Sequence, residues 1–232
     1  MHHQQNRKTA LITGGAGGLG RAIEKIFKRN AISVALTDVI KPTNKASLFF
    51  KCNLRNPKDV GALFNWTMEN LGVPDILVLN AGIGIKEKLS EGDPEKWQQV
   101  MDTNVMGALR CIRAFVPQML KGKGRHVVFV SSVAANQPHP YGGIYSASKT
   151  ALDVIAETLR LETLPHLKIT TISPGATDTP FFNNQLSGGS DLPMDCPIMT
   201  ADEVAEDVFY AIDKVGGGGI NRIVTRPFGQ QF

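Results

Sequence analysis

The sequence predicts a doubly wound α/β fold, in which helices cover both faces of one parallel β-sheet within a single domain spanning residues 1–232. Three observations lead to this prediction. Short apolar runs alternate with longer segments of helical periodicity, a glycine-rich turn follows the first apolar run, and 232 residues are close to the upper size that one hydrophobic core fills. Strands that are apolar throughout are typical of parallel sheets buried on both faces.

The elements follow one another in the order that such a fold requires. Short apolar and β-branched runs predict strands at residues 9–13, 32–37, 47–52, 75–79, 126–130, 168–172 and 222–225. Apolar residues at helical spacing predict helices at 19–29, 56–71, 95–120, 145–164 and 201–215, the second of which opens on the start signal Asn56-Pro57. Between Asp38 and Ser47 a crossover helix is expected, yet the composition there predicts a loop.

Composition and charge exclude several classes of protein. The net charge of +4 comes from dispersed basic residues, without the clustering or interleaved aromatics of a nucleic-acid binder. No apolar run reaches the roughly 18 residues of a membrane helix. The cysteines Cys52, Cys111 and Cys196 are too few and too scattered for a disulfide framework or a metal cluster. We therefore expect no nucleic acid, membrane or metal partner, a cytoplasmic location, and flexible residues 1–7.

A glycine-rich turn, Thr13-Gly14-Gly15-Ala16-Gly17-Gly18-Leu19-Gly20, joins the first strand directly to a helix. Glycines let the backbone turn tightly and approach a pyrophosphate, whose charge the amides at the helix N-terminus receive. Two registers fit this turn. Gly15, Gly17 and Gly20 match G-x-G-x-x-G, while Gly14, Gly18 and Gly20 match T-G-x-x-x-G-x-G. Both predict that the turn binds a dinucleotide.

Asp38, at the end of the second expected strand, bears on which dinucleotide binds. A carboxylate there accepts hydrogen bonds from both ribose hydroxyls of NAD and repels the 2′-phosphate of NADP, so NAD is the expected cofactor. Two alternatives stay open. Asp38 could instead cap a turn, and Lys41 or Lys45 could fold back to hold the phosphate of NADP.

Tyr145 and Lys149 lie four residues apart, on one face of an expected helix. A lysine ammonium beside a tyrosine favours the phenolate and brings its pKa of about 10 towards the neutral range. Ser132 closes the strand just upstream, where its hydroxyl could hydrogen-bond a substrate oxygen. Such a tyrosine–lysine pair alone is usually a solvated pair on a helix surface. Its position after the glycine turn and the serine favours a catalytic role.

These motifs together resemble the short-chain dehydrogenase/reductase family in its compact, single-domain form with a Rossmann-type sheet. The resemblance covers nearly the whole chain. The separation of 13 positions from Ser132 to Tyr145 favours these two over their neighbours Ser131 and Tyr141. The family order is kept by the T-G-x-x-x-G-x-G turn, Asp38, Asn80-Ala81-Gly82, Asn104, Ser132, Tyr145, Lys149 and Pro174-Gly175.

The resemblance implies a mechanism. Tyr145 would be the general acid/base, and Lys149 would lower its pKa and hold the nicotinamide ribose. Ser132 would polarise the substrate oxygen. Asn104 would anchor a water that links Lys149 to solvent, although alone it is also explained as a helix irregularity. The cofactor-binding residues implied are Gly14, Gly18, Leu19, Gly20, Asp38, Asn53, Leu54, Asn80, Ala81, Gly82, Tyr145, Lys149, Pro174, Gly175, Thr177 and Thr179.

The chain also departs from the family pattern. Asn53 stands where the family usually has an acid against the adenine, Leu79 replaces the first asparagine of the usual pair, and the crossover helix after Asp38 is missing. The first change keeps hydrogen bonding without charge, and the second should affect packing more than chemistry. The third leaves the adenine pocket more open.

Substrate specificity in the family lies mainly after Pro174-Gly175, so residues 177–200 are the expected substrate-binding loop, with Gly188-Gly189 as the hinge of a lid. Its lining is apolar and contains no Arg or Lys, which does not favour a strongly anionic substrate unless Arg226 or a distant lysine reaches in. The expected substrate is a small secondary alcohol or ketone.

Two rival functions remain. The tail at 220–227 is similar to a subgroup that acts on short 3-hydroxy acids and commonly uses NADP, which makes an NADP-dependent ketoreductase or 3-hydroxy acid dehydrogenase the alternative. A non-catalytic dinucleotide-binding sensor is the other. The resemblance further implies a homo-oligomer, a tetramer or dimer, that pairs the two long helices around Val100 and Leu152.

Overall fold

The structure is a computed structural model that describes residues 7–42, 48–188, 198–214, 216 and 218–230. Several expectations therefore lie outside the described residues. They concern the flexibility of residues 1–6, the loop at 43–47 with Lys45, and the part of the substrate loop at 189–197. Residues 215 and 217, at and just after the expected end of the last helix, are also outside.

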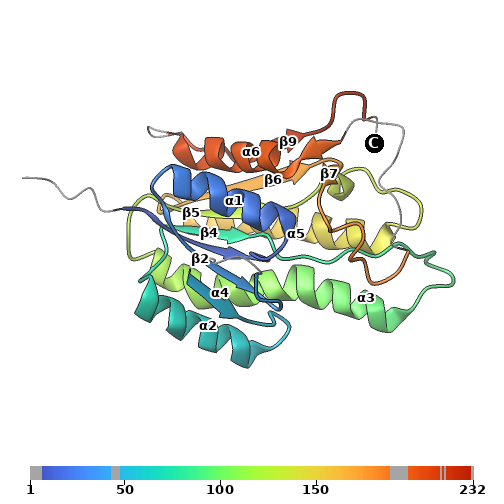
Figure 1. Ribbon diagram of the computed structural model, residues 1–232, viewed down its shortest axis with the longest axis horizontal. Coiled ribbons are helices and arrows are strands. Elements are labelled where there is room, and N and C mark those ends of the chain that lie inside the picture. Colours follow the sequence, from blue (N-terminus) through green and yellow to red (C-terminus); the bar gives the residue numbers. More distant parts are fainter. Residues whose placement is uncertain (1–6, 43–47, 189–197, 215, 217, 231–232) are drawn as a thin grey trace, which may run out of the picture.

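One seven-stranded parallel sheet forms the centre of the molecule, with the strand order β3-β2-β1-β4-β5-β6-β9 (Figure 1). A separate pair of very short parallel strands, β7 (Thr177–Asp178) and β8 (Met199–Thr200), lies outside it. The strands of the large sheet are β1 (Thr9–Thr13), β2 (Ser33–Asp38), β3 (Leu48–Lys51), β4 (Ile76–Leu79), β5 (Arg125–Val130), β6 (Leu167–Pro174) and β9 (Arg222–Thr225). The doubly wound single-domain sheet is thus confirmed.

Helices cover both faces of this sheet (Figure 1). The helix α1 (Gly18–Arg29) and the helix α6 (Ala201–Asp213) pack on one face against alternate strand residues such as Ile12 and Val128. The intervening strand residues, such as Leu11 and Val127, point to the other face. That face is covered by α2 (Pro57–Asn70), α4 (Gly107–Met119) and α5 (Gly143–Thr163).

The helix expected at 95–120 is interrupted. It comprises α3 (Pro94–Met101), a π-helical turn at Asp102–Met106 and α4. The amide of Gly107 donates to the carbonyl of Asp102, five residues back, so the turn holds one more residue than an α-helical turn. Asn104 lies in its centre. The helix start at Asn56 is as expected, since its side chain accepts a hydrogen bond from the amide of Lys58.

The sheet order reverses beside β1, where β2 leads to one side and β4 to the other. Such a switch point leaves a crevice at the carboxyl ends of the strands, and ligands of open α/β sheets bind there. β2 and β3 pair in parallel although Val39–Pro42, the described part of their connection, contains no helix.

One expectation about assembly is wrong in its detail. Val100 and Leu152 are 0% and 2% exposed within the single chain, so neither side chain can form the centre of an interface. Both sequence positions look apolar because they fill the core. The exposed apolar residues of α5 are Val154 and Leu161. No helix in the described residues combines the length and the apolar character needed to cross a bilayer.

Candidate active site

A cavity of about 630 Å³ lies at the carboxyl ends of the strands. Nearly all of the site residues predicted from the sequence line it: Gly14, Gly18, Leu19, Gly20, Asp38, Asn53, Leu54, Asn80, Ala81, Gly82, Ser132, Tyr145, Lys149, Pro174, Gly175, Thr177 and Thr179. Asn104 is the exception, being buried behind the wall. The fold therefore brings together residues that are up to 165 positions apart in the chain, Gly14 and Thr179.

The glycine turn fits a pyrophosphate. Gly14 has a φ of +64°, and a Cβ there would lie 2.8 Å from the Cα of Ala81. A Cβ on Gly20 would lie 2.3 Å from the carbonyl oxygen of Gly14. The helix α1 that follows has Gly17 as its N-cap, no capping side chain and no acid in its first turn. Its N-terminal amides and partial positive charge are thus left for an anion in the cavity.

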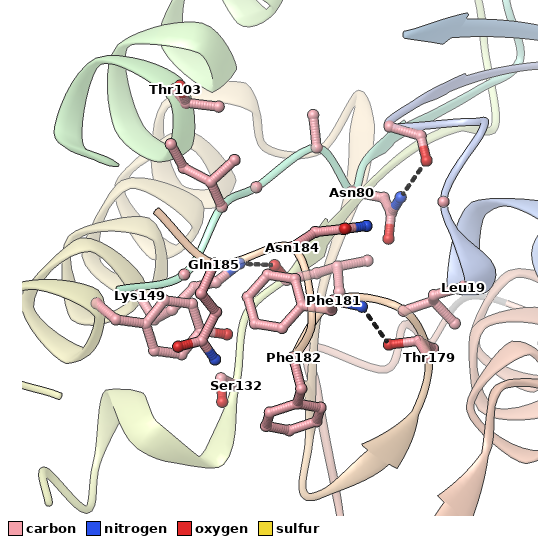
Figure 2. A pocket seen from close by; sticks show the side chains of 18 of the residues that line it. Leu19, Asn80, Thr103, Ser132, Lys149, Thr179, Phe181, Phe182, Asn184 and Gln185 are labelled. Atoms are coloured by element: carbon pink, nitrogen blue, oxygen red, sulfur yellow. Dashed lines mark hydrogen bonds between the residues drawn. The ribbon is translucent and has the colours of Figure 1, made fainter. Parts of the chain in front are cut away.

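Asn80 supports this turn from the neighbouring strand. Its Nδ2 donates to the carbonyl oxygens of Thr13 and Gly14, at 3.0 and 3.1 Å, and the hydroxyl of Thr13 accepts from the amides of Asn80 and Ala81. A dashed line in Figure 2 marks a hydrogen bond of the Asn80 side chain. Asn80 therefore positions the turn rather than offering its amide nitrogen freely to a ligand. Leu79, where the family has another asparagine, is buried in the sheet.

Asp38 is held by two backbone amides. Its Oδ2 accepts a hydrogen bond from Ala16 in the glycine turn at 2.9 Å, and its Oδ1 accepts one from Ile40 at 3.3 Å. The turn-capping role that the sequence left open is therefore present. Each oxygen keeps a further lone pair, so capping does not prevent contact with ribose hydroxyls. Asn53 is also used locally, because its Oδ1 accepts from the amide of Arg55.

Lys149 and Tyr145 come from the first turns of α5. The Lys149 Nζ donates to the carbonyl oxygen of Val130 at 2.9 Å and lies 5.7 Å from the centroid of the Tyr145 ring. Burial raises the pKa of Tyr145 to about 12, although a hydrogen bond with Ser132 opposes this. Burial lowers the pKa of Lys149 to about 8, opposed by the charge of Asp153. The pKa of Tyr145 is thus raised rather than lowered, because the effect of burial is larger than that of the hydrogen bond with Ser132.

Ser132 is held from two sides. Its Oγ accepts the amide hydrogen of Ala134 at 3.1 Å, as the cap of the short helix Val133–Ala135. Its own O–H hydrogen is the one that can be donated to the Tyr145 oxygen, in the hydrogen bond that lowers the pKa of Tyr145.

Asn104 connects two parts of the site from behind. Its Oδ1 accepts from the amide of Ile83 at 2.8 Å, and its Nδ2 donates to the carbonyl of Ile83 and to the hydroxyl of Ser148, both at 3.0 Å. Both amide hydrogens are therefore used, and one lone pair of Oδ1 remains. The side chain fastens the segment after β4 to α5, the helix that carries Tyr145 and Lys149.

The substrate end of the cavity is formed by the 181–188 segment, which lies over the residues after β4. The ring of Phe181 lies 5.7 Å from that of Tyr145 and 5.9 Å from that of Phe182. The amide of Leu186 donates to the carbonyl of Gly84, and that of Lys86 to the carbonyl of Ser187. Figure 2 shows Phe181 and Gln185 reaching towards Lys149 and Ser132. The expected apolar lining at Phe181, Phe182 and Leu186 is therefore present.

Glu87 fastens this segment to the rest of the protein. One carboxylate oxygen accepts from the hydroxyl of Ser187, and the other accepts from the amide of Asp93 and the indole nitrogen of Trp97, at 2.9 and 2.8 Å. These hydrogen bonds, with the one from Ser187 contributing most, lower the pKa of Glu87 to about 2.

Sequence reasoning missed several residues of the lining. They include Arg55, Lys86, Gln137, His139, Gln185 and Gln230. The amide of Ala176 donates to the Oε1 of Gln230 at 3.0 Å, and a Cβ on Gly175 would come within 2.2 Å of that oxygen. The close approach explains a glycine at 175, but no pattern in the sequence indicates which residue approaches it. Among the described residues, no group of three His, Cys, Asp or Glu side chains is placed to hold a metal ion.

Residues 8–188 match the family described as short chain dehydrogenase. The chain belongs to the short-chain dehydrogenase/reductase family. It is therefore an oxidoreductase by family, as the sequence predicted. An uncharacterised oxidoreductase of Staphylococcus saprophyticus is 30% identical over 233 residues, which cover 95% of this chain and 97% of the relative.

Solved structures of short-chain dehydrogenases share the fold. A serine dehydrogenase in a closed form complexed with NADP+ superposes with a TM-score of 0.89 at 23% identity, covering 97% of this chain and 96% of that one. The 3-ketoacyl-(acyl-carrier-protein) reductase of Brucella melitensis complexed with NADH gives a TM-score of 0.82 at 24% identity, covering 94% and 96%. At these identities the likeness concerns the Rossmann-type fold alone.

Proposed function

We propose that this protein is an NAD(H)-dependent oxidoreductase that interconverts a small secondary alcohol and its ketone. The observation that carries the proposal is the convergence of Ser132, Tyr145 and Lys149 on the cavity into which the uncapped N-terminus of α1 also opens. A hydride-transferring enzyme needs both features within one cavity, because the acid/base must meet the substrate while the dinucleotide is held beside it.

The dinucleotide would bind along the carboxyl ends of the strands. The first turn of α1 would receive the pyrophosphate, and Asp38 the adenine ribose, with Asn53 and Leu54 near the base. Lys149, Pro174, Gly175, Thr177 and Thr179 line the other end, where the nicotinamide and its ribose would lie. Structural relatives in complexes with NADP+ and with NADH support a nicotinamide cofactor in general, and the charge of Asp38 favours NAD.

Bound nicotinamide supplies the acceptor or the donor of the hydride. The protein's own residues manage the proton and the substrate oxygen. Ser132, whose Oγ is fixed by the amide of Ala134, would hold that oxygen through its O–H, and the Tyr145 Oη would take its proton during oxidation or return it during reduction. Lys149 would favour the tyrosinate electrostatically, and Asn104 would keep α5 and the segment after β4 in register and offer its remaining lone pair to a water.

The cofactor preference is tested by paired fluorescence titrations with NADH and NADPH. The wild-type protein is expected to bind NADH at least about tenfold more tightly, because the 2′-phosphate meets the carboxylate of Asp38. Asp38→Asn keeps an oxygen for the amide of Ala16 and removes the charge, so it should gain affinity for NADPH. Stronger NADPH binding by the wild-type protein would favour the 3-hydroxy acid or ketoreductase alternative, with Lys41 or Arg55 holding the phosphate. Binding of neither would contradict the proposal.

A dinucleotide sensor without chemistry is the third candidate. It requires bound cofactor without turnover of any alcohol or carbonyl compound. The enzyme proposal requires cofactor-dependent turnover that is lost when the Tyr145 hydroxyl is removed.

We retain homo-oligomer formation as part of the proposal, with the contact shifted from the buried Leu152 to the exposed Val154 and Leu161 of α5. Gel filtration at micromolar concentration should give a dimer or tetramer, and a stable monomer would contradict it. A cytoplasmic location remains a proposal, supported by the free, buried thiols of Cys52 and Cys111.

A further inference from the structure

The substrate end of the cavity carries positive charge and hydrogen-bond donors that the sequence of the substrate loop did not indicate. Lys86, Gln137 and His139 all line it, and all three lie outside residues 177–200. Asp38 is the single carboxylate among the described lining residues, and it lies at the end of β2. Three strand positions separate β2 from β5, so Asp38 and the residues that follow β5 are about 14 Å apart across the sheet.

Lys86 belongs to the segment after β4, which passes close to Lys149 and Phe181. A Cβ on Gly82 would lie 3.4 Å from the Nζ of Lys149, and one on Gly84 would lie 3.0 Å from the ring of Phe181, which packs against Tyr145. Lys86 follows two residues later, where its carbonyl oxygen and Cβ lie against Gly188. The residue is half-buried, and its ammonium group has neither an ion pair nor a hydrogen bond within the part of the chain that the structure describes.

The neighbouring acid does not neutralise Lys86. Glu87 is next in the sequence, but it does not line the cavity, and its two oxygens are bound to Ser187, Asp93 and Trp97. Its nearby cation is Lys96, at 3.5 Å. Among the residues that the structure describes, no carboxylate neutralises the positive charge of Lys86, which is available to a ligand.

The loop before α5 adds neutral donors next to Lys86. The amide of Glu87 donates to the carbonyl of Tyr141 at 2.8 Å, which joins the two segments. Burial and, second, the charge of Lys86 lower the pKa of His139, so its ring is neutral at physiological pH. Arg226 donates to the Oε1 of Gln137 at 2.9 Å, which turns the two N–H donors of that amide away from Arg226.

We propose, on the basis of the function above, that the substrate is a small hydroxy acid or oxo acid whose carboxylate binds to Lys86 and to the amide of Gln137. The ammonium group of Lys86 attracts a negatively charged group, and a carboxylate has the two acceptor oxygens that separate donors such as Lys86 and Gln137 require. This reverses the expectation of a non-anionic substrate, because the cation comes from the segment after β4 rather than from the substrate loop.

The reaction balances with the cofactor already proposed. In oxidation, the hydrogen on the alcohol carbon leaves with its electron pair to the oxidised nicotinamide, and the hydroxyl proton passes to Tyr145. The hydroxy acid becomes an oxo acid and the dinucleotide is reduced. The carboxylate takes no part in the bond changes and serves to orient the substrate.

The experiment compares matched pairs of substrates, each a short oxo acid and its methyl ester, on the wild-type protein, Lys86→Gln and Lys88→Gln. Lys88 is a control because it is paired with Glu91 and does not line the cavity. The wild-type protein should prefer the acid, and Lys86→Gln should lower the acid-to-ester ratio of kcat/KM about tenfold or more, mainly through KM. The ratio should not change in Lys88→Gln. Equal use of acid and ester by the wild-type protein would overturn the carboxylate assignment and leave the oxidoreductase proposal intact.

A binding measurement separates this inference from the proposed function. Butyrate cannot react, so its binding to the dinucleotide-loaded protein can be measured by calorimetry without any turnover. Saturable binding of butyrate, but not of butyramide, that weakens in Lys86→Gln supports the site even if no substrate has been found. Absence of butyrate binding to the loaded wild-type protein would overturn it.

Discussion

The ammonium nitrogen of Lys149 lies 5.7 Å from the centroid of the Tyr145 ring and gives its hydrogen bond to the carbonyl of Val130. Removal from water raises the pKa of Tyr145 to about 12 and lowers that of Lys149 to about 8. Each side chain is therefore biased towards its neutral form. At neutral pH Tyr145 is then mainly a proton donor, and it becomes a base only as the pH rises.

Alcohol oxidation and carbonyl reduction should therefore depend on pH in different ways. Below pH 12 the basic form of Tyr145 is the minor one, and its fraction grows with pH, so kcat/KM for alcohol oxidation should rise steadily between pH 7 and 9. Carbonyl reduction uses the protonated form and should not rise over this range. Initial rates in both directions measure this. An oxidation profile that falls with pH would contradict the assignment of Tyr145 as the base.

Removing the Tyr145 hydroxyl should abolish chemistry but not cofactor binding. Tyr145→Phe is expected to lower kcat by about 100-fold or more, since a general acid/base contributes at least that much. The ring contact with Phe181 is kept, so NADH titration should give a similar affinity. Tyr141→Phe is the control, because Tyr141 is 55% exposed and lies four residues before the catalytic position. Equal turnover in Tyr145→Phe would contradict the mechanism.

Asn104→Ala should destabilise the protein and slow it. The change leaves the partly buried amide and carbonyl of Ile83 without their side-chain partner, at a cost of about 2–4 kcal/mol. For a domain of this size the melting temperature should fall by about 5–10 °C. The segment after β4 should also lose its attachment to α5, so kcat should decrease in the folded variant at low temperature. An unchanged melting temperature would show that these hydrogen bonds do not fasten the segment.

The two glycines Gly20 and Gly61 should respond in opposite ways to alanine. In Gly20→Ala the new methyl group would lie 2.3 Å from the carbonyl oxygen of Gly14, which must then shift, with a loss of about 1–3 kcal/mol and weaker NADH binding. Gly61 is exposed within α2 and has no atom within 4 Å of its Cβ position. Gly61→Ala should stabilise the helix by about 0.5–1 kcal/mol. Urea unfolding of both variants makes the comparison.

His126 should make the protein less stable in mild acid. Burial lowers its pKa to about 4, and its Nε2 is hydrogen-bonded to Thr170 at 2.8 Å. Between pH 6.5 and 4 the unfolded chain binds a proton at this ring and the folded chain does not, so stability falls as the pH decreases, by about 3 kcal/mol across the window. In His126→Asn the slope of stability against pH should flatten, whatever its absolute stability. His166→Asn, at an exposed histidine, should keep the wild-type slope.

The sequence predicts the sheet and the residues that line the cavity around the glycine turn, because both depend on local patterns. The glycine turn needs glycines at fixed positions, and Asn56-Pro57 starts a helix by its own chemistry. The substrate end could not be predicted in the same way. Lys86 follows an unremarkable segment, and its relation to Gln137 depends on hydrogen bonds between segments about 50 residues apart. Likewise, Val100 and Leu152 are apolar in the sequence whether they face a partner or the core, and only packing decides between these.

The π-helical turn at Asp102–Met106 makes the length of the chain at this point matter more than its composition. One additional residue separates α3 from α4, and successive residues of an α-helix are rotated by about 100° around its axis. Deleting one residue from the turn would restore a regular α-helix and rotate α4 by that angle. Cys111 and Phe115 would then leave the core, and Asn104 would no longer face Ile83. Deleting any single residue of this turn should therefore destabilise the protein much more than substituting the exposed Met106 does, and a scan of single deletions would measure this.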